Sequence, residues 1–272
     1  MQLPQGKHMT EFAAVTPESH AKKVWKHVTN YTFAAADTVI PLVGDEINKV
    51  LPVMPVGFVE QEAGYQLVAI ASLQPGQNLY VAPDGKWLGT YIPSALRAYP
   101  FRLLKPENAE KSVLCINEGS GLVVESTEDG NAFFDEQNQP AQGIKDMLSF
   151  LSAVEASLDV TQRAVNALAD AGLITPWEIN LKKGEEVVPV SGLFRVDEVA
   201  LNKLDDEDFL TLRKASGLAI AYAQLFSLNQ IAILERLDQF HGEIVAQEAA
   251  NSESASLEGF SLAEDEGSLN FD

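Results

Sequence analysis

The chain has 272 residues and a formal net charge of −20, with 19 Lys and Arg against 39 Asp and Glu. This acidic balance argues against nonspecific binding to nucleic acid or anionic lipid, because phosphate contacts need clustered cations. Its length allows one large domain or two small ones, and 46% hydrophobic residues exclude a chain that is disordered throughout. Two interpretations of the charge stay open: a well-solvated acidic surface, or an acidic site for cationic partners.

Cysteine usage and apolar runs limit the cellular setting. Cys115 is the only cysteine, so neither an internal disulfide nor a cysteine-based metal cage is available. The first residues, MQLPQGKHMTEF, lack the apolar core of a signal peptide, and no run reaches the roughly eighteen uninterrupted apolar residues of a membrane span. We therefore expect a cytoplasmic chain without membrane insertion, unless it is exported without a cleaved N-terminal signal.

The first fifty residues predict little regular structure. Residues 1–18 are expected to be a loose lead-in. The β-branched and aromatic side chains of HAKKVWKHVTNYTF, residues 20–33, favour an extended segment. IPLVGDEINKVL, residues 40–51, opens with a proline and has apolar residues at helical spacing, which predicts a short helix.

Residues 58–134 are predicted to be mainly β-structure. YQLVAIASL, residues 65–73, is a nearly continuous apolar strand and so should be buried on both faces. KSVLCINEG, residues 111–119, is predicted to be another strand. Turn residues between strand-like runs predict two hairpins: one over residues 78–92 around Pro83-Asp84-Gly85, the other over 123–136 around Asp129-Gly130.

After Pro140 the apolar spacing becomes helical, and Gly172 ends the pattern. The positions that share this spacing are Ile144, Met147, Leu148, Leu151, Val154, Leu158, Val165 and Leu168. A third hairpin is predicted over residues 177–197, with its turn at Lys183-Gly184. The final elements are predicted helices over 197–204 and 205–237, with acids at 205–208 suiting a helix start.

The segment GLAIAYAQLF, residues 217–226, is apolar on all sides and is predicted to be a central buried helix. From Glu243 onward the chain has no Lys or Arg and is rich in acids, Ser and Gly, which predicts a disordered tail over 243–272. The apolar residues within that tail leave a docking or export signal as an alternative. We expect one α+β domain over 19–242, its β-rich, antiparallel or mixed N-terminal half packed against a mainly helical C-terminal half.

The sequence offers little for catalysis, and we predict no catalytic residue, metal site or cofactor. The four histidines, His8, His20, His27 and His241, lie near the ends of the chain, and an exposed or capping role is expected for them. Cys115 lies inside an apolar strand and is predicted to be a small buried hydrophobe. Carboxylate pairs such as Glu118 with Glu125, or Asp135 with Glu136, cannot be distinguished from chance in so acidic a chain.

The stretch WLGTYIPSALRAYPFRLL, residues 87–104, combines aromatic residues, prolines and two arginines. A short helical turn is predicted between Pro93 and Pro100. The arginines can pair with acids, stack on rings or hold an anionic ligand. The candidate contacts to a ligand or partner are Trp87, Tyr91, Arg97, Tyr99 and Arg102. The competing interpretation is a tightly packed crossover between a hairpin and a strand.

Several segments resemble the bacterial SapC-like family over about residues 19–240. They are SHAKKVWKHVTNYTFAAADTVIPLVGDEI, PVGFV, NLYVAPDGKWLGTYIPSALRAYPF, LCINE, LFRVDEVALNKLDDEDFLTL and AIAYAQLFSL. The resemblance implies association with bacterial surface-layer loci, and with outer-membrane TonB-dependent receptors and with halogenase-like and cupin-like proteins. It supplies no catalytic residues to carry over. A peptide-transport permease shares the family's name, but the predicted lack of membrane spans excludes that identity.

Three functions are therefore kept in view. The first is a non-enzymatic accessory or binding protein of a surface-layer or TonB-dependent uptake system, with receptor-system proteins or a peptide as partner. The second is an exported surface-layer component that uses the acidic tail as its signal. The third is a carboxylate-dependent enzyme acting on a peptide or small ligand.

Overall fold

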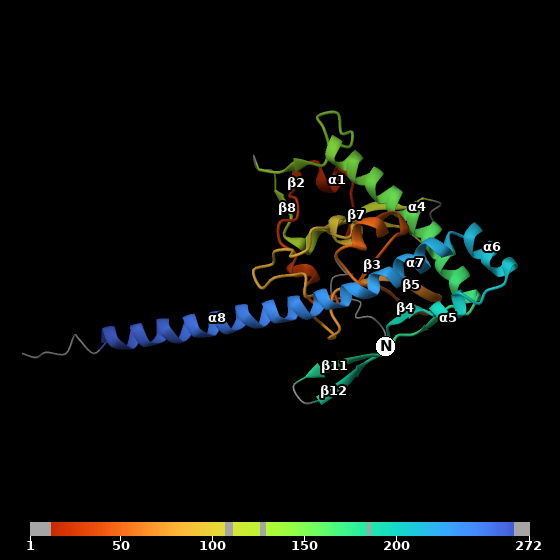
Figure 1. Ribbon diagram of the computed structural model, residues 1–272. Coiled ribbons are helices and arrows are strands. Elements are labelled where there is room, and N and C mark those ends of the chain that lie inside the picture. Colours follow the sequence, from red (N-terminus) through yellow and green to blue (C-terminus); the bar gives the residue numbers. More distant parts are fainter. Residues whose placement is uncertain (1–11, 107–110, 126–128, 184–185, 264–272) are drawn as a thin grey trace, which may run out of the picture.

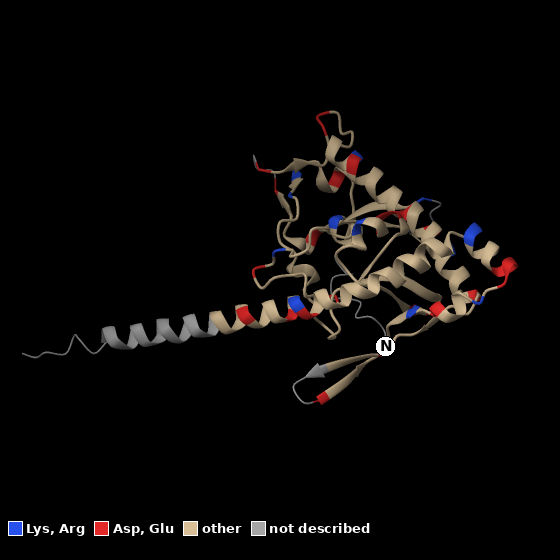
Figure 2. Ribbon diagram, viewed as in Figure 1, with Lys and Arg blue, Asp and Glu red and all other residues tan. Residues whose placement is uncertain are grey.

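The computed structural model describes residues 12–106, 111–125, 129–183 and 186–263. It has the predicted α+β architecture, with β-strands concentrated in the N-terminal half and long helices in the C-terminal half (Figure 1). Charged residues of both signs are distributed along the ribbon of the body (Figure 2).

The centre is a five-stranded antiparallel sheet with the strand order β10-β13-β4-β5-β3. Its strands are β3 (Val39–Pro41), β4 (Val56–Gln61), β5 (Gly64–Ile70), β10 (Ile174–Pro176) and β13 (Phe194–Val196). In β5 the four consecutive residues from Leu67 to Ile70 are at most 1% exposed, although they alternate between the two faces. The prediction of a strand buried on both faces is confirmed.

Two three-stranded sheets form a second β-region, with the orders β1-β7-β6 and β8-β2-β9. Their strands are β1 (Phe12–Ala14), β2 (Lys23–Trp25), β6 (Phe101–Leu104), β7 (Val113–Asn117), β8 (Val123–Glu125) and β9 (Asn131–Ala132). All neighbours are antiparallel. The predicted strand over 111–119 is confirmed as β7.

The predicted hairpin over 123–136 is wrong, because β2 lies between its two arms. Val24 pairs with Val124 on one side and with Ala132 on the other. Gly130 makes this possible: a Cβ atom there would lie 2.5 Å from a methyl carbon of Val24. Gly130 therefore allows close packing against β2 as well as a bend in the chain.

The N-terminal segment is more ordered than predicted where the structure describes it. Residues 12–14 form β1, which pairs with β7, and α1 (Pro17–His20) follows. Residues 1–11 of the predicted lead-in lie outside the described residues. The predicted extended segment over 20–33 is a strand only at β2 and ends in a 3-10 turn, η2 (Thr32–Ala34).

The predicted hairpin over 78–92 keeps its turn, and its arms pair only briefly, through an isolated bridge between Val81 and Trp87 and main-chain hydrogen bonds from the Ala82 amide to the Lys86 carbonyl and from the Leu88 amide to the Tyr80 carbonyl. Gly85 supplies the turn with a φ of +83°. Asn78 draws the first arm into the core instead, since its side chain donates to the Ala34 carbonyl and accepts from the Tyr80 amide. These side-chain hydrogen bonds add to the short main-chain pairing of the arms, which does not extend into full strands.

The helices follow the predicted positions in part: the predicted helix over 40–51 begins only at Gly44, because Ile40 and Pro41 belong to β3, and the one over 205–237 is interrupted at Ser216, whose φ is +63°. The short ones are η3 (Gly44–Glu46), α2 (Ile47–Val50), α3 (Ser94–Arg97), η4 (Glu118–Ser120), α5 (Glu198–Leu201) and η5 (Leu228–Gln230), and the long ones are α4 (Gln142–Asp170), α6 (Asp206–Lys214), α7 (Gly217–Ser227) and α8 (Ile231–Ala263). Gly172, at φ +66°, ends the α4 region as predicted. Asp205 caps α6 by accepting from the main-chain amides two and three residues on, those of Glu207 and Asp208.

The third predicted hairpin is confirmed as β11 (Ile179–Lys183) paired with β12 (Glu186–Val190), and it projects from the body (Figure 1). Its predicted turn includes Gly184, which lies outside the described residues.

Helix α7 is buried on one side rather than all round. Tyr222 and Phe226 are 40% and 66% exposed and stack on each other. On the buried side, the Gln224 amide lies between β13 and β4: its Oε1 accepts from the Val196 amide at 2.9 Å and its Nε2 donates to the Val56 carbonyl at 3.2 Å. The two strands pair at Phe194 and Phe58, so Gln224 continues their ladder where direct pairing ends.

Helix α8 extends away from the body (Figure 1) and differs from the predicted disordered tail. It is helical through Ala263, beyond the predicted boundary at Glu243, and residues 264–272 lie outside the described part. The segment EIVAQEAA, residues 243–250, consists largely of good helix formers, which accounts for the difference. Residues 217–247 are long and apolar enough to cross a membrane by length and composition alone; their first part is α7, which packs on the central sheet.

Helix α4 connects the two β-regions. Its second half packs on the central sheet through Ala164, Val165 and Leu168. Ile144 and Leu151, in its first half, belong to the second buried cluster, around Trp25 and Phe133. The exposed side of this junction carries the cavities described next.

Candidate functional site

The five residues predicted as ligand contacts do not gather on one surface. Trp87 stacks on Tyr80, with ring centroids 5.3 Å apart, and donates its indole N–H to the main-chain oxygen of Tyr91. Tyr99 and Arg102 also pack elsewhere. Tyr99 stacks on Phe33 with ring centroids 3.9 Å apart, and the Arg102 guanidinium lies 5.1 Å from the centre of the Phe12 ring. The structure brings together only Tyr91 and Arg97 at a cavity.

Glu46 is a buried acceptor that holds Tyr91 and Ser94 in place. Glu46 is 4% exposed, and its carboxylate accepts four hydrogen bonds. Oε1 accepts from the Val43 amide at 3.1 Å and the Ser94 hydroxyl at 2.9 Å, while Oε2 accepts from the Ser94 amide at 2.7 Å and the Tyr91 hydroxyl at 2.8 Å. The carboxylate therefore clamps the start of α3 onto η3. With its lone pairs occupied in this way, Glu46 is suited to anchoring rather than to proton abstraction.

Arg97 is the outermost member of this cluster. Its Nη2 donates to the Tyr91 hydroxyl at 3.1 Å and its Nε donates to the Ile92 carbonyl at 3.0 Å. Burial, reinforced by the hydrogen bond to Glu46, raises the pKa of Tyr91 to about 12, so the phenol stays protonated at neutral pH. The guanidinium also lies 4.9 Å from the centre of the Phe150 ring.

Two cavities adjoin along α4. The Tyr91 cavity, of about 270 Å³, is lined by Tyr91, Arg97, Lys49 and Asp45 opposite Phe150, Ala153, Val154 and Ser157. The Trp25 cavity, of about 410 Å³, is lined by Trp25, His27, Asn131, Gly143, Asp146, Met147 and Phe150. Phe150 belongs to both, and the α4 residues recur every three or four positions on one face. We call the two cavities together the α4 groove.

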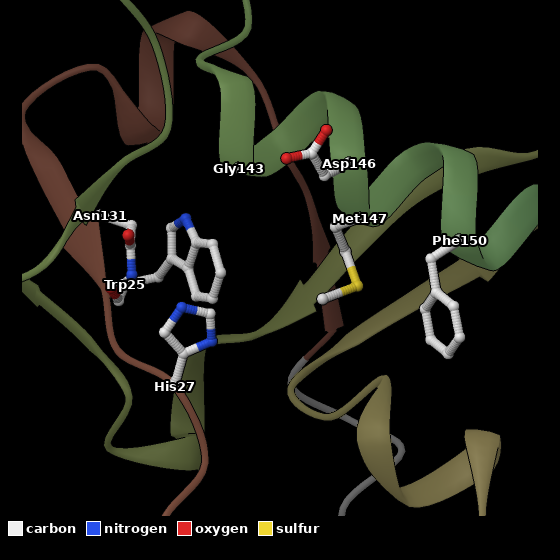
Figure 3. Close-up of a pocket in the computed structure, with 7 residues that line it drawn as sticks. All are labelled: Trp25, His27, Asn131, Gly143, Asp146, Met147 and Phe150. Carbon is white, nitrogen blue, oxygen red and sulfur yellow. Dashed lines mark hydrogen bonds between the residues drawn. The ribbon is translucent and has the colours of Figure 1, made fainter.

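The Trp25 cavity has aromatic and thioether walls with a carboxylate at the rim. Figure 3 shows Trp25 and His27 on one side of an open space, with Met147 and Phe150 on the other and Asp146 above them. His27 stands edge-on to Trp25, with ring centroids 4.7 Å apart. The indole N–H of Trp25 is buried and has no hydrogen-bond partner among the described residues.

Sequence reasoning identified Tyr91 and Arg97 by residue type but missed Glu46, Trp25 and Phe150. Glu46 looks like any other acid in an acidic chain. The spacing of Met147 and Phe150 gives the face of a helix but not the segment that lies opposite it. Asp45, which follows the only glycine of IPLVGDEINKVL, gave no separate signal.

The other titratable groups form no second site. Glu118 pairs with Lys23 at 2.9 Å, and this contact lowers the pKa of Glu118. Cys115 is buried, as predicted, which raises the pKa of its thiol. In the part of the chain that the structure describes, no three His, Cys, Asp or Glu side chains are grouped to hold a metal ion.

Exposure is wrong for His20, whose side chain is fully buried against Phe133. Its Nδ1 accepts from the Thr16 amide at 3.4 Å, and its Nε2 lies 3.4 Å from Glu118 Oε1. Burial lowers the pKa of His20 below 6.5; Glu118 opposes this shift and Lys23 adds to it.

This burial predicts a loss of stability in mild acid. The unfolded chain binds a proton at His20 more readily than the folded chain does, so the contribution is complete above pH 6.5 and is lost as the pH falls. The urea midpoint should drop between pH 7.5 and pH 5.5, and the drop should be smaller in His20→Phe. The matched control is His27→Phe, an exposed position, which should retain the full drop. Equal drops in all three proteins would mean that another group titrates.

A family model described as SapC matches residues 15–234, most of the chain and all of the α4 groove. The chain belongs to the SapC family. Searches among curated proteins and solved structures gave no significant match. Membership confirms the resemblance noted in the sequence, and it gives no residue of this SapC protein a role.

Proposed function

We propose that this SapC protein is a non-catalytic binding protein that holds a peptide or small ligand in the α4 groove through the ligand's carboxylate. The observation that carries the proposal is the position of Arg97. Its guanidinium is fixed over Phe150, where the two cavities meet, by hydrogen bonds that use two of its N–H donors. The remaining donors have no partner among the described residues and suit a carboxylate.

The groove contains charges of both signs. Lys49 and Arg97 line the Tyr91 cavity together with Asp45 and the buried Glu46. The carboxylate of Glu46 is already occupied by four donors, whereas Arg97 is not saturated. Local hydrogen bonding to Arg97, rather than the field of this acidic chain, must therefore hold an anionic group.

We further propose that the bound molecule serves a surface-layer or TonB-dependent outer-membrane uptake system, in which this protein is an accessory. Membership of the SapC family supports this proposal. Both cavities lie within the matched region, so binding at the α4 groove would be a property of the domain rather than of its termini.

The carboxylate site is tested with Arg97→Gln and its matched control Arg102→Gln. Both arginines are exposed and lie over aromatic rings, but only Arg97 lines the groove. The probe is N-acetyl-alanyl-phenylalanyl-alanine, with its C-terminal amide as the uncharged comparison, in an NMR titration at low salt. We expect Arg97→Gln to weaken binding of the acid by about 10- to 100-fold, the size of a charge-assisted hydrogen bond, with Arg102→Gln close to the wild type.

The free acid should also bind more tightly than its amide in the wild type and in Arg102→Gln, but not in Arg97→Gln. Equal binding of acid and amide, or equal behaviour of the two variants, would show that Arg97 does not hold a carboxylate. The proposal would then be wrong.

A further inference from the structure

We propose that the ligand of the α4 groove is a short peptide of about three residues with both termini free. The peptide's ammonium group lies at Asp146, its central apolar side chain in the Trp25 cavity and its carboxylate at Arg97. This inference rests on the proposed function for its carboxylate end. The ammonium end and the length are new and depend on different residues.

The two ends of the groove carry opposite free charges. Asp146 lines the Trp25 cavity and uses Oδ1 to accept from Gln142 at 2.7 Å, so Oδ2 carries no hydrogen bond among the described residues. Arg97, beyond Phe150, keeps unused N–H donors. A ligand that satisfies both must carry a positive group at one end and a negative group at the other.

The spacing of the ends fits a tripeptide. The Arg97 guanidinium lies over Phe150, four positions after Asp146 on α4, and the Tyr91 cavity continues to Ala153, seven positions after Asp146. At 1.5 Å per residue these separations are about 6 Å and about 10 Å along the helix axis. Two to three extended residues span about 7 to 10 Å, whereas the ammonium and carboxylate of one free amino acid are much too close together to reach both ends.

The middle of the groove suits an apolar side chain. Trp25, His27, Met147 and Phe150 face the open space in Figure 3. Its volume of about 410 Å³ exceeds the roughly 150 Å³ cavity that accommodates benzene in a protein core. A methionine wall adapts to side chains of different shape, so the site would accept several apolar residues.

The Trp25 side chain also provides a donor for a peptide carbonyl. Its unpaired indole N–H points toward the space between Asn131 and Gly143 (Figure 3). Asn131 borders this space and makes only a 3.4 Å hydrogen bond to the main-chain oxygen of Trp25. Rotation of Asn131 would open the indole N–H to the ligand, and binding would then satisfy a buried donor that is otherwise unpaired.

A ligand with one positive and one negative end is also compatible with the strong negative charge of this protein. With a formal net charge of −20, the protein repels anions at long range. A peptide with two free termini is neutral overall, so it approaches without this penalty and its charges act only at the two ends of the groove.

The test compares alanyl-phenylalanyl-alanine with its N-acetylated form, following the three indole N–H signals by NMR. We expect the free peptide to bind about tenfold more tightly than the acetylated one and to shift the Trp25 signal, which His27→Ala identifies through its contact with Trp25. Asp146→Asn, which retains an acceptor for Gln142, should abolish the advantage of the free amine. The matched control Asp159→Asn, on the same helix but outside both cavities, should keep it.

The apolar subsite is tested by filling it. Met147→Trp should weaken binding of the free tripeptide by at least tenfold, and Leu148→Trp, at the next and outward-facing position, should not. If the acetylated peptide binds as well as the free one while Arg97→Gln still weakens both, the ammonium site is wrong and the carboxylate site stands. If no variant affects binding, or no peptide binds, both proposals fail together.

Discussion

Replacing Glu46 with alanine is expected to lower the free energy of unfolding by roughly 3–5 kcal/mol, because buried donors lose their only acceptor. The affected donors are the amides of Val43 and Ser94 and the hydroxyls of Ser94 and Tyr91. An isolated hydrogen bond is worth much less, but a buried donor that finds no partner costs about 1–3 kcal/mol. Urea unfolding at pH 7.5 measures the effect.

The neighbouring acid provides the control for Glu46. Asp45 is exposed, and Asp45→Ala should stay within about 0.5 kcal/mol of the wild type. Glu46→Gln should fall between the two, since it keeps one acceptor oxygen but turns an NH2 group toward the donors. If Glu46→Ala were as stable as Asp45→Ala, water would be replacing the carboxylate and the clamp on α3 would not exist.

Replacing Gln224 with leucine is expected to cost about 2–4 kcal/mol, because the Val196 amide is left unpaired inside the core. The Val56 carbonyl also loses a donor, although the Ser227 hydroxyl, which donates its one proton to the Gln224 carbonyl at 2.7 Å, lies 3.2 Å from the Val56 carbonyl and can turn to it. The size of the side chain hardly changes, so loss of volume is not the cause. Hydrogen exchange gives the most direct measurement: the Val196 amide should exchange faster in Gln224→Leu than in the wild type.

Gln239→Leu is the control for Gln224, because Gln239 is exposed on α8 and its replacement should leave stability within about 0.5 kcal/mol. Should Gln224→Leu be as stable as the wild type, β13 and β4 would have closed up to pair directly. The inserted amide would then be dispensable.

Local patterns predicted the elements whose cause is local. Helical spacing after Pro140 gave α4, and Gly172 gave its end, because both signals lie within the segment they describe. The hairpin predicted around Asp129-Gly130 is wrong because the strand that separates its two arms, β2, lies about a hundred residues earlier in the sequence. Turn residues report a bend in the chain, but nothing within residues 123–136 shows that β2 takes the place between the two arms.

In the candidate site, too, some residues could be predicted from local sequence and others could not. Arg97 stood out because cations are scarce in this chain and aromatic residues surround it in sequence. Glu46 did not, since burial and hydrogen bonding distinguish it from surface acids, and neither can be read from residue type. The Trp25 cavity needed two segments, β2 and α4, whose proximity is a property of the fold alone.

The insertion of β2 between β8 and β9 also has a consequence for the order of assembly. During synthesis, the first strands leave the ribosome long before the segments that pair with them, so Val24 and Trp25 stay without β-partners until residues 123–132 follow. Contacts this distant in sequence slow folding, because a long loop must close before any of them forms. The wall of the groove formed by β2 is thus made early in synthesis and is among the last parts of the fold to find its partners, so the groove is complete only when folding is complete.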